Sequence, residues 1–414
     1  MLSRINIHDI RIYIIMHGAL LFLIRPYLTY TIGPNVITGT RISENFYFIA
    51  FEIGLFAFIS MLIISLRTKT TGQEDNFVSK VSQVSIERFF AVYLVWFILY
   101  VIFNYERLSL GIMTLILEPQ VEFLQSDSSF ISINLTGIYS FFIIAAFSVK
   151  GPKKIRKFLI FLVLLGALPV GIISGSKTLV LNPLFLLLLR YSSQRKGISL
   201  TLISICLLIG IPLFAALEYV RYEGVAGFST FFSSTSTTFN LKSILQVATN
   251  RFYGTDIIYS IVNRHEGNNV PYLLGSSLIG LIFFLIPRSI WVDKPVISFG
   301  KTVSENYLGS EFWSTGISAA PTWIGELFAN FGYFSIFFYI ISLIFIMRYI
   351  KSFFSKTAAS WKRVYVFPLA FTTLSFFQEA SIAGWILQLF TLIALCYFFS
   401  ILLHGRQLSS KRLQ

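Results

Sequence analysis

Long apolar runs recur along this chain, and their length restricts the folds that it can adopt. A helix needs about 20 apolar residues to cross a bilayer, and lipid admits only structures that satisfy their own backbone groups. Hydrophobic residues make up 55% of the 414 residues, and charged residues only 13%. The sequence therefore predicts an all-α polytopic membrane protein. We expect about ten transmembrane helices, at residues 11–32, 46–66, 88–105, 129–149, 155–173, 178–191, 198–218, 322–347, 363–379 and 382–403.

Basic residues are distributed unevenly between the two predicted sides of the membrane. The chain has 33 Lys and Arg residues against 19 Asp and Glu residues, a formal net charge of +14. Most of the basic residues fall in the predicted inner loops and termini, as they do in membrane proteins generally. The other parts carry a slight acidic excess. The charge therefore predicts cytoplasmic N- and C-termini, and it gives no support for a nucleic-acid partner.

One long segment, residues 218–321, lacks a clear membrane-spanning run. We expect it to be extracytoplasmic and partly helical, between an N-terminal transmembrane bundle (1–217) and C-terminal transmembrane helices (322–414), with all three parts in one folding unit. Residues 272–290 are apolar enough to span the membrane, but an eleventh span would move the basic loop 348–363 outside. That arrangement violates the positive-inside rule. We therefore expect this stretch to lie on the outer face or to dip into it.

The turn Ser174-Gly175-Ser176-Lys177-Thr178 joins two predicted helices. The following run, 178–191, reaches only about 20 Å at ~1.5 Å per residue, whereas the hydrocarbon core is about 30 Å thick. The turn is therefore predicted to lie below the outer surface. A helix N-terminus with Ser176 and Lys177 favours an anion such as a phosphate. The alternative is a tight turn whose lysine extends to the interface.

Two opposite charges are predicted at equal depth in the first two helices. Arg25 and Glu52 each lie about six residues, or ~9 Å, from the outer ends of their helices. We expect them to form an ion pair, which fits a structural role as well as a role in the site. His17, in the same helix as Arg25, fits a packed and hydrogen-bonded histidine.

Basic residues beside aromatic residues recur in the outer segment. Guanidinium groups bind phosphate oxygens through paired hydrogen bonds, and Tyr or Trp rings stack on sugar faces. Together these residues suit a sugar attached to a diphosphate, although each one singly also fits a solvated loop cation. The candidate residues are Arg221, Arg251, Tyr253, Arg264, His265, Arg288, Trp291 and Lys294.

Other polar positions allow structural explanations. Glu326 begins the helix that returns to the membrane, where the helix dipole favours a carboxylate. A structural role explains it, and so does a role in holding an arginine of the outer segment. Cys206 and Cys396 lie inside predicted helices and fit apolar packing. The four histidines are scattered, so no metal site is expected.

Three stretches together resemble those of a known family. They are Pro287-Arg288-Ser289-Ile290-Trp291 with Asp293-Lys294-Pro295, the return helix with Gly325-Glu326-Leu327 and Asn330-Phe331-Gly332, and the Gly175-Ser176-Lys177 turn. On these residues the chain resembles the Wzy-type oligosaccharide repeat-unit polymerases of O-antigen and capsule assembly. Members of that family often have arginine where Lys177 stands, so two-pronged phosphate binding is not expected there.

The resemblance implies a membrane-embedded, GT-C-like glycosyltransferase fold, related to that of the O-antigen ligases. It implies an enzyme of polysaccharide and lipopolysaccharide biosynthesis, on the outer face of the bacterial inner membrane. Such an enzyme moves a growing glycan from undecaprenyl diphosphate to a sugar hydroxyl of a second lipid-linked repeat unit. A departing diphosphate needs fixed cations, and the acceptor hydroxyl needs a base.

The resemblance also assigns roles to residues of this chain. It implies that residues 218–321 form the catalytic segment. Expected catalytic residues are Arg221, Arg251, Arg288 and Glu326, and expected substrate-binding residues are Arg25, Ser176, Lys177, Tyr253, His265, Trp291 and Lys294. No cofactor, nucleotide sugar or metal is expected. The implied partners are undecaprenyl-diphosphate-linked oligosaccharides, the bilayer, a chain-length-regulating membrane protein and a flippase.

Two alternatives stay open on the sequence. A lipid-linked oligosaccharide flippase would show repeated halves and a polar site near the midplane, whereas the intramembrane charges here cluster in the outer half. An O-antigen ligase-like glycosyltransferase would share the donor chemistry and differ in its acceptor, the lipid A core. The identities of the acceptor hydroxyl and of the general base are left open.

Overall fold

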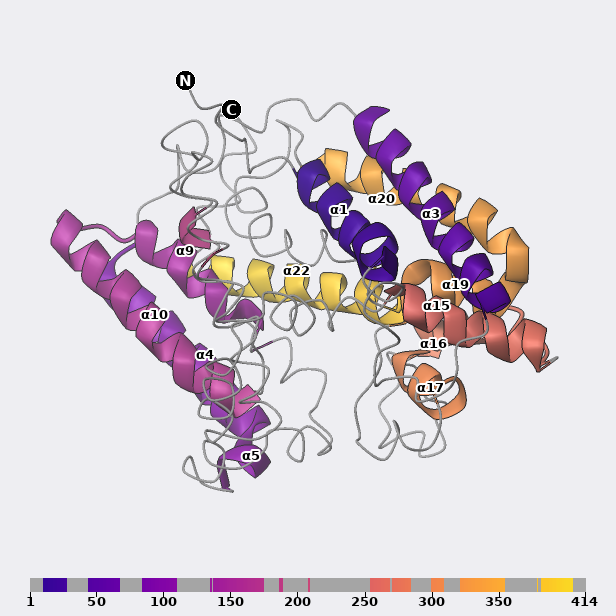
Figure 1. Ribbon diagram of the computed structural model, residues 1–414. Coiled ribbons are helices and arrows are strands. Elements are labelled where there is room, and N and C mark those ends of the chain that lie inside the picture. Colours follow the sequence, from indigo (N-terminus) through magenta and orange to yellow (C-terminus); the bar gives the residue numbers. More distant parts are fainter. Residues whose placement is uncertain are drawn as a thin grey trace, which may run out of the picture.

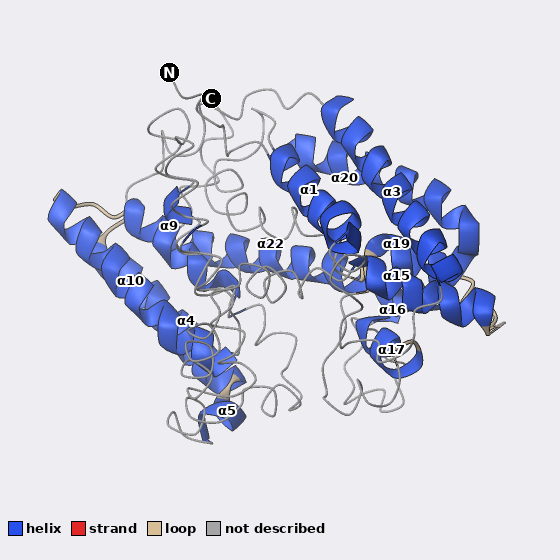
Figure 2. Ribbon diagram, in the orientation of Figure 1, coloured by secondary structure: helices blue, strands red, loops and turns tan. Residues whose placement is uncertain are grey.

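The computed structural model describes residues 10–27, 44–67, 84–109, 135, 137–174, 186–188, 208, 254–268, 270–283, 299–308, 321–353, 378 and 381–404. These residues are helical apart from turns, short connecting stretches and one isolated bridge between Val84 and Val149 (Figures 1 and 2). The elements are α1 (Ile10–Ala19), η1 (Leu20–Ile24), α3 (Glu44–Arg67), α4 (Ile86–Phe103), α5 (Tyr105–Ser109), η2 (Ile138–Ser140), α9 (Phe141–Phe147), α10 (Lys153–Ser174), α15 (Gly254–Val262), η3 (Asn263–Gly267), α16 (Ser276–Phe283), α17 (Phe299–Asn306), α19 (Trp323–Phe331), η4 (Gly332–Phe334), α20 (Ser335–Phe353) and α22 (Ile382–His404).

Four helical stretches in the described part of the chain are long and apolar enough to cross a membrane. They are Asn45–Arg67, Ile86–Phe103, Trp323–Tyr349 and Ile382–His404. They agree with four of the predicted spans, at 46–66, 88–105, 322–347 and 382–403, and with a helical membrane protein.

The other predicted spans are described only in part, or fall outside the described residues. The first appears as α1 and η1, the span at 129–149 as a shorter apolar helix at Ile138–Phe147, and the span at 155–173 as α10. Nearly all of 178–191, 198–218 and 363–379 lies outside the described residues. Of the apolar stretch 272–290, residues 276–283 form α16.

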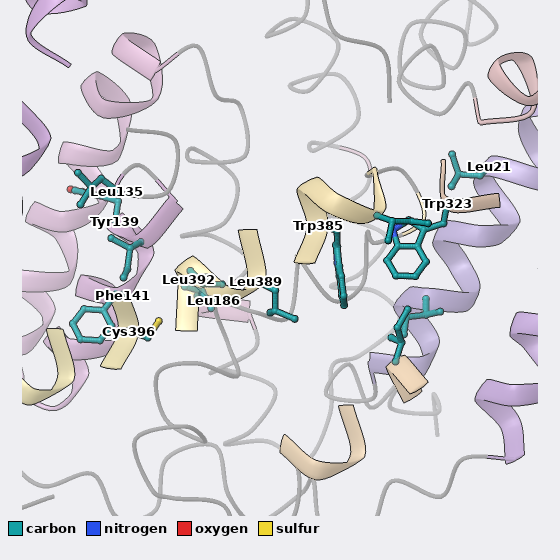
Figure 3. Packing of buried hydrophobic residues seen from close by; sticks show 14 of the residues in the cluster. Leu21, Leu135, Tyr139, Phe141, Leu186, Trp323, Trp385, Leu389, Leu392 and Cys396 are labelled. Atoms are coloured by element: carbon teal, nitrogen blue, oxygen red, sulfur yellow. The ribbon is translucent and has the colours of Figure 1, made fainter. Parts of the chain in front are cut away.

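The described helices form two groups, and α22 connects them (Figure 1). One group contains α4, α9 and α10, and the other contains α1, α3, α15, α19 and α20. α22 contacts α4 at one end of its course and α16 at the other. Buried apolar side chains follow this connection: Leu389 and Leu392 of α22 lie between the Tyr139 and Trp323 sides of the core (Figure 3).

Aromatic rings dominate the core of both groups. Trp96 of α4 is fully buried, stacks on Tyr100 with ring centroids 5.2 Å apart, and donates its indole N–H to the Leu135 carbonyl at 2.9 Å. In the other group, the rings of Trp323 and Trp385 meet edge to face, with centroids 5.4 Å apart. The Trp96 indole thus has a partner for its ring and another for its N–H, as buried tryptophans usually do. The two ends of the molecule are therefore both firmly packed.

The predicted outer segment contributes one buried helix to the second group. All nine residues of α15 are buried. A Cβ atom added at Gly254 would come within 3.1 Å of Leu21 and of Thr322, and one at Gly325 within 3.2 Å of Ile261. Because these glycines lack a side chain, α15 can pack closely against η1 and α19. Part of the segment expected above the bilayer is thus an integral part of the helical core.

The predicted continuous helix at 322–347 is broken in the structure. α19 ends at Phe331 and is capped by Gly332, which has φ +56°; the short 3-10 turn η4 then leads to α20, which begins at Ser335. A Cβ atom added at Gly332 would come within 2.9 Å of Cζ in the Tyr272 ring. A glycine is needed there both for the left-handed backbone and for the space. The break ends α19 as a short buried helix before the chain continues as α20.

Candidate functional site

Arg25 is buried in an ion pair with Asp256. Nε and Nη2 of the guanidinium both donate to Oδ2 of Asp256, at 3.3 and 3.2 Å, and the two residues are only 2% and 5% exposed. Asp256 lies in the first turn of α15. The expected partner, Glu52, is instead exposed on the surface of α3. The predicted ion pair of Arg25 with Glu52 is therefore wrong, because α15 packs inside the bundle and brings a closer carboxylate.

The helix before Arg25 is wound as a π-helix, and the proline that follows Arg25 leaves one of its carbonyls without a backbone donor. The N–H of Arg25 donates to the carbonyl of Leu20, five residues back. In this winding, the carbonyl of Leu21 would accept from the N–H of residue 26, but Pro26 has none. The hydroxyl of Thr255 donates to the Leu21 carbonyl instead, at 3.0 Å. The start of α15 thus completes the backbone of the first helix.

Glu326 is fully buried at the meeting point of three helices. Its Oε1 accepts from the Ser277 hydroxyl of α16 at 2.9 Å, and its Oε2 accepts from the backbone N–H of Ile382, the first residue of α22, at 2.7 Å. Thr322 caps α19 by accepting from the N–H of Gly325 at 3.0 Å, with the strained φ of +55°. A carboxylate satisfies N–H groups at helix starts well. This geometry favours the structural explanation of Glu326.

Asn330 continues this network one turn along α19. Its Nδ2 donates to the Ser277 hydroxyl at 2.8 Å and to the Glu326 carbonyl at 2.7 Å, and its Oδ1 accepts from the N–H of Gly275 at 2.9 Å. The N–H of Leu274 donates to the Asn330 carbonyl at 3.1 Å. Asn330 is therefore fully used in holding the turn before α16 against α19. Such satisfied polar networks fix a unique packing.

His265 lies in a second π-helix, η3, and is 4% exposed. Its Nδ1 is 2.9 Å from the carbonyl of Val270, and its Nε2 is 3.0 Å from the Tyr307 hydroxyl. A carbonyl only accepts, so Nδ1 carries a proton, and in the neutral imidazole Nε2 then accepts from the Tyr307 hydroxyl. Burial raises the pKa of Tyr307 to about 12, so its hydroxyl keeps its proton at neutral pH. Both ring nitrogens of His265 are engaged within the protein.

Tyr272 connects His265 to a carboxylate. Its ring stacks on the His265 ring, with centroids 4.9 Å apart and planes 14° apart, and meets Phe328 edge to face. Its hydroxyl donates to Oε1 of the half-buried Glu266. Burial, and then the hydrogen bond to Glu266, raises the pKa of Tyr272 well above its ordinary value. Tyr272 therefore keeps its proton and holds the Glu266 carboxylate in place.

An apolar cavity of about 930 Å³ opens beside the Glu326 network. It lies between α19, α20 and α22, and it extends along α22 from Ile382 to Ile393, about 17 Å at ~1.5 Å per residue. Ligand pockets in proteins have volumes of about 300–1,000 Å³. Lining residues include Leu278, Trp323, Leu327, Phe331, Phe338, Ser342, Arg348, Trp385 and Phe390. The cavity is suited to a hydrocarbon chain.

Most of the predicted site residues lie outside the described residues. They are Ser176, Lys177, Arg221, Arg251, Tyr253, Arg288, Trp291 and Lys294. Of those that the structure describes, Glu326 and Arg25 belong to the polar clusters of the second helix group, His265 belongs to the cluster with Tyr272, and Arg264 is exposed. Within the described part of the chain, no three His, Cys, Asp or Glu residues gather as metal ligands.

The structure also identifies polar residues that sequence reasoning missed. They are Thr255, Asp256, Glu266, Tyr272, Ser277 and Tyr307. One signal for Asp256 was its place just after Gly254, at the start of an apolar run. Acidic residues in a first helical turn are common, so this signal is weak.

Comparisons of this chain with protein-family models, with curated proteins and with solved structures gave no match.

Proposed function

We propose that this protein is a lipid-diphosphate-dependent glycosyltransferase that polymerises undecaprenyl-diphosphate-linked oligosaccharide repeat units. It would act on the outer face of the bacterial inner membrane, as a multi-pass protein with about ten spans, a GT-C-like fold and cytoplasmic termini. The expected partners are the lipid-linked substrates, a flippase that delivers them and a chain-length-regulating membrane protein.

The observation that carries the proposal is the apolar cavity between α19, α20 and α22. It holds space for a hydrocarbon chain between two helical stretches, Trp323–Tyr349 and Ile382–His404, that are long enough to cross a membrane. One end of it adjoins Ile382 and Trp323, at the helix starts that surround Glu326. A substrate with a long lipid tail and a polar head needs this combination of an apolar channel that ends beside polar groups.

The chemistry that the proposal requires is divided between two sets of residues. Cations must stabilise the departing diphosphate, and Arg221, Arg251, Arg288, Lys177 and Lys294 are the candidates. Removing one fixed donor of this kind typically costs about 10²–10³ in rate. Tyr253 and Trp291 are candidates for sugar stacking. Arg25 is proposed here to support the site through Asp256, because its guanidinium is buried in that pair.

The two rivals make different predictions. A flippase needs a polar path across the membrane, whereas the cavity beside α22 is lined almost entirely by apolar side chains. An O-antigen ligase-like enzyme would fit the same cavity, since both enzymes use a lipid diphosphate donor. The two enzymes therefore have to be distinguished by the acceptor molecule that they use.

One assay separates these functions. Purified protein in proteoliposomes is incubated with a lipid-linked repeat unit alone, and the glycan products are resolved by length. A polymerase gives a ladder of repeat units and releases lipid diphosphate. A ligase gives no product until lipid A core is added, and a flippase moves the substrate between leaflets without changing it. An unchanged substrate under every condition would refute the glycosyltransferase proposal.

A further inference from the structure

The carboxylates that the structure describes are not equally available for chemistry. Asp256 is buried against Arg25, and both oxygens of Glu326 accept hydrogen bonds from Ser277 and Ile382. Glu87 begins α4, at the predicted cytoplasmic end of that helix. Each of these three carboxylates is thus either committed to the fold or on the wrong predicted side of the membrane.

Glu266 is different, because only one of its oxygens is fixed. Oε1 accepts from Tyr272, whereas no group in the described part of the chain hydrogen-bonds to Oε2. The residue is half-buried, so part of its side chain is open to a ligand. A general base needs this arrangement: a fixed orientation on one side and an open acceptor on the other.

The support behind Glu266 is unusually complete. Tyr272 is held by its stacking on His265, by Phe328 and by its close approach to Gly332. His265 is fixed in turn by Val270 and Tyr307. Five residues thus position the Tyr272 hydroxyl, which donates its hydrogen bond to the Glu266 carboxylate. π-helical turns such as η3 often occur at functional sites.

The place of Glu266 also fits an acceptor sugar. The carboxylate of Glu266 lies close enough to the Tyr333 hydroxyl to interact with it electrostatically. The carboxylate of Glu52, near the start of α3, does the same. Tyr333 and Phe334, beside the break at Gly332, are 56% and 76% exposed. By the predicted topology, the start of α3 faces the outside, where the proposed reaction occurs, and the crossing within 323–349 would then begin near Ser335, where α20 starts. Exposed aromatic rings next to a carboxylate can bind a sugar face beside the base.

We propose that Glu266 is the general base of the glycosyl transfer, an inference that rests on the proposed function. The acceptor hydroxyl gives its proton to Oε2 of Glu266, and its oxygen bonds to the anomeric carbon of the donor sugar. The bond from that carbon to the diphosphate oxygen breaks, and the electron pair leaves with the lipid diphosphate. His265 and Tyr272 are then positioning residues, and they need not touch the substrate.

The test uses the full-length protein in proteoliposomes with a lipid-linked repeat unit. Glu266→Gln keeps an oxygen for Tyr272 but cannot accept the proton. Its kcat should fall by about 10²–10⁴, with KM for the repeat unit and the melting temperature close to those of the wild type. Glu52→Gln is the matched control, since Glu52 is exposed nearby, and it should retain wild-type kcat.

A second variant separates base catalysis from support of the fold. Azide is an anion that needs no deprotonation, so Glu266→Ala with azide should form glycosyl azide and release lipid diphosphate. If the wild type polymerises and the Glu266→Gln variant has a kcat within about fivefold of the wild-type value, Glu266 is not the base. The proposed function would then still stand. A Glu266→Ala variant that stays folded and forms no glycosyl azide would also overturn the assignment of Glu266 as the base. A wild-type protein that releases no lipid diphosphate would overturn the proposed function as well.

Discussion

Arg25 and Asp256 are separated by 231 positions in the sequence, yet they form a buried ion pair between the first helix and α15. Removing one partner deprives the other buried charge of this ion pair, which costs about 3–5 kcal/mol. We therefore expect Arg25→Met and Asp256→Leu each to lower the melting temperature in detergent strongly. The double variant should recover most of the loss, because an apolar pair of similar volume replaces a buried ion pair well. Additive losses would contradict this account.

The hydroxyl of Thr255 should matter because of Pro26. Thr255→Val leaves the Leu21 carbonyl without its donor in a buried position, at a cost of about 1–3 kcal/mol. Pro26→Ala restores an N–H that can serve this carbonyl, so Thr255→Val should cost less in that background. Thermal unfolding of the four proteins measures the coupling. Ser260→Ala is the control, because Ser260 donates to a carbonyl within its own helix, and it should have little effect.

Glu326 should prove to be a structural residue. Glu326→Gln introduces an N–H₂ group in place of one oxygen that now accepts from Ser277 or Ile382, and a buried hydrogen bond is lost. We expect a loss of about 1–3 kcal/mol in stability, with activity falling only in proportion to the folded fraction. Ser277→Ala should show a similar, smaller loss. A Glu326→Gln protein with wild-type melting and no activity would instead support a catalytic role.

The apolar cavity should be necessary for substrate binding. Ser342→Trp places a large ring in the cavity between α20 and α22, so the lipid tail should lose space and KM for the lipid-linked repeat unit should rise at least tenfold. Ile344→Trp, two residues away and 37% exposed, is the matched control and should leave KM unchanged. Equal kinetics for the two variants would show that the lipid tail binds elsewhere.

The predicted orientation can be tested with cysteine labelling. Because the basic loops are expected inside, a cysteine at Ser233 should react with an impermeant reagent in intact spheroplasts. A cysteine at Ser355 should react only after the membrane is opened. The reverse labelling pattern would invert the topology and move the proposed reaction to the wrong face.

The amino-acid sequence alone was enough to locate the bounds of the four described spans to within two residues. The length of an apolar run is a local property of the sequence. In lipid, such a run forms a helix because a helix satisfies all of its own backbone hydrogen-bonding groups. The polar contacts were less accessible. Equal depth in adjacent helices suggested Glu52 for Arg25, and nothing local indicated that α15 packs within the bundle. The break at Gly332 was likewise hidden, since an apolar pattern continues through it.

Tertiary packing decided which polar groups are committed and which are open. Glu326 and His265 both looked available for chemistry, yet the ends of α16 and α22 occupy the first, and Val270 and Tyr307 occupy the second. Glu266 drew no attention in the sequence, and it gained a fixed orientation only through Tyr272. The physical reason is that a hydrogen bond depends on the position of both partners. Residues such as Arg25 and Asp256 receive those positions only when distant helices pack together.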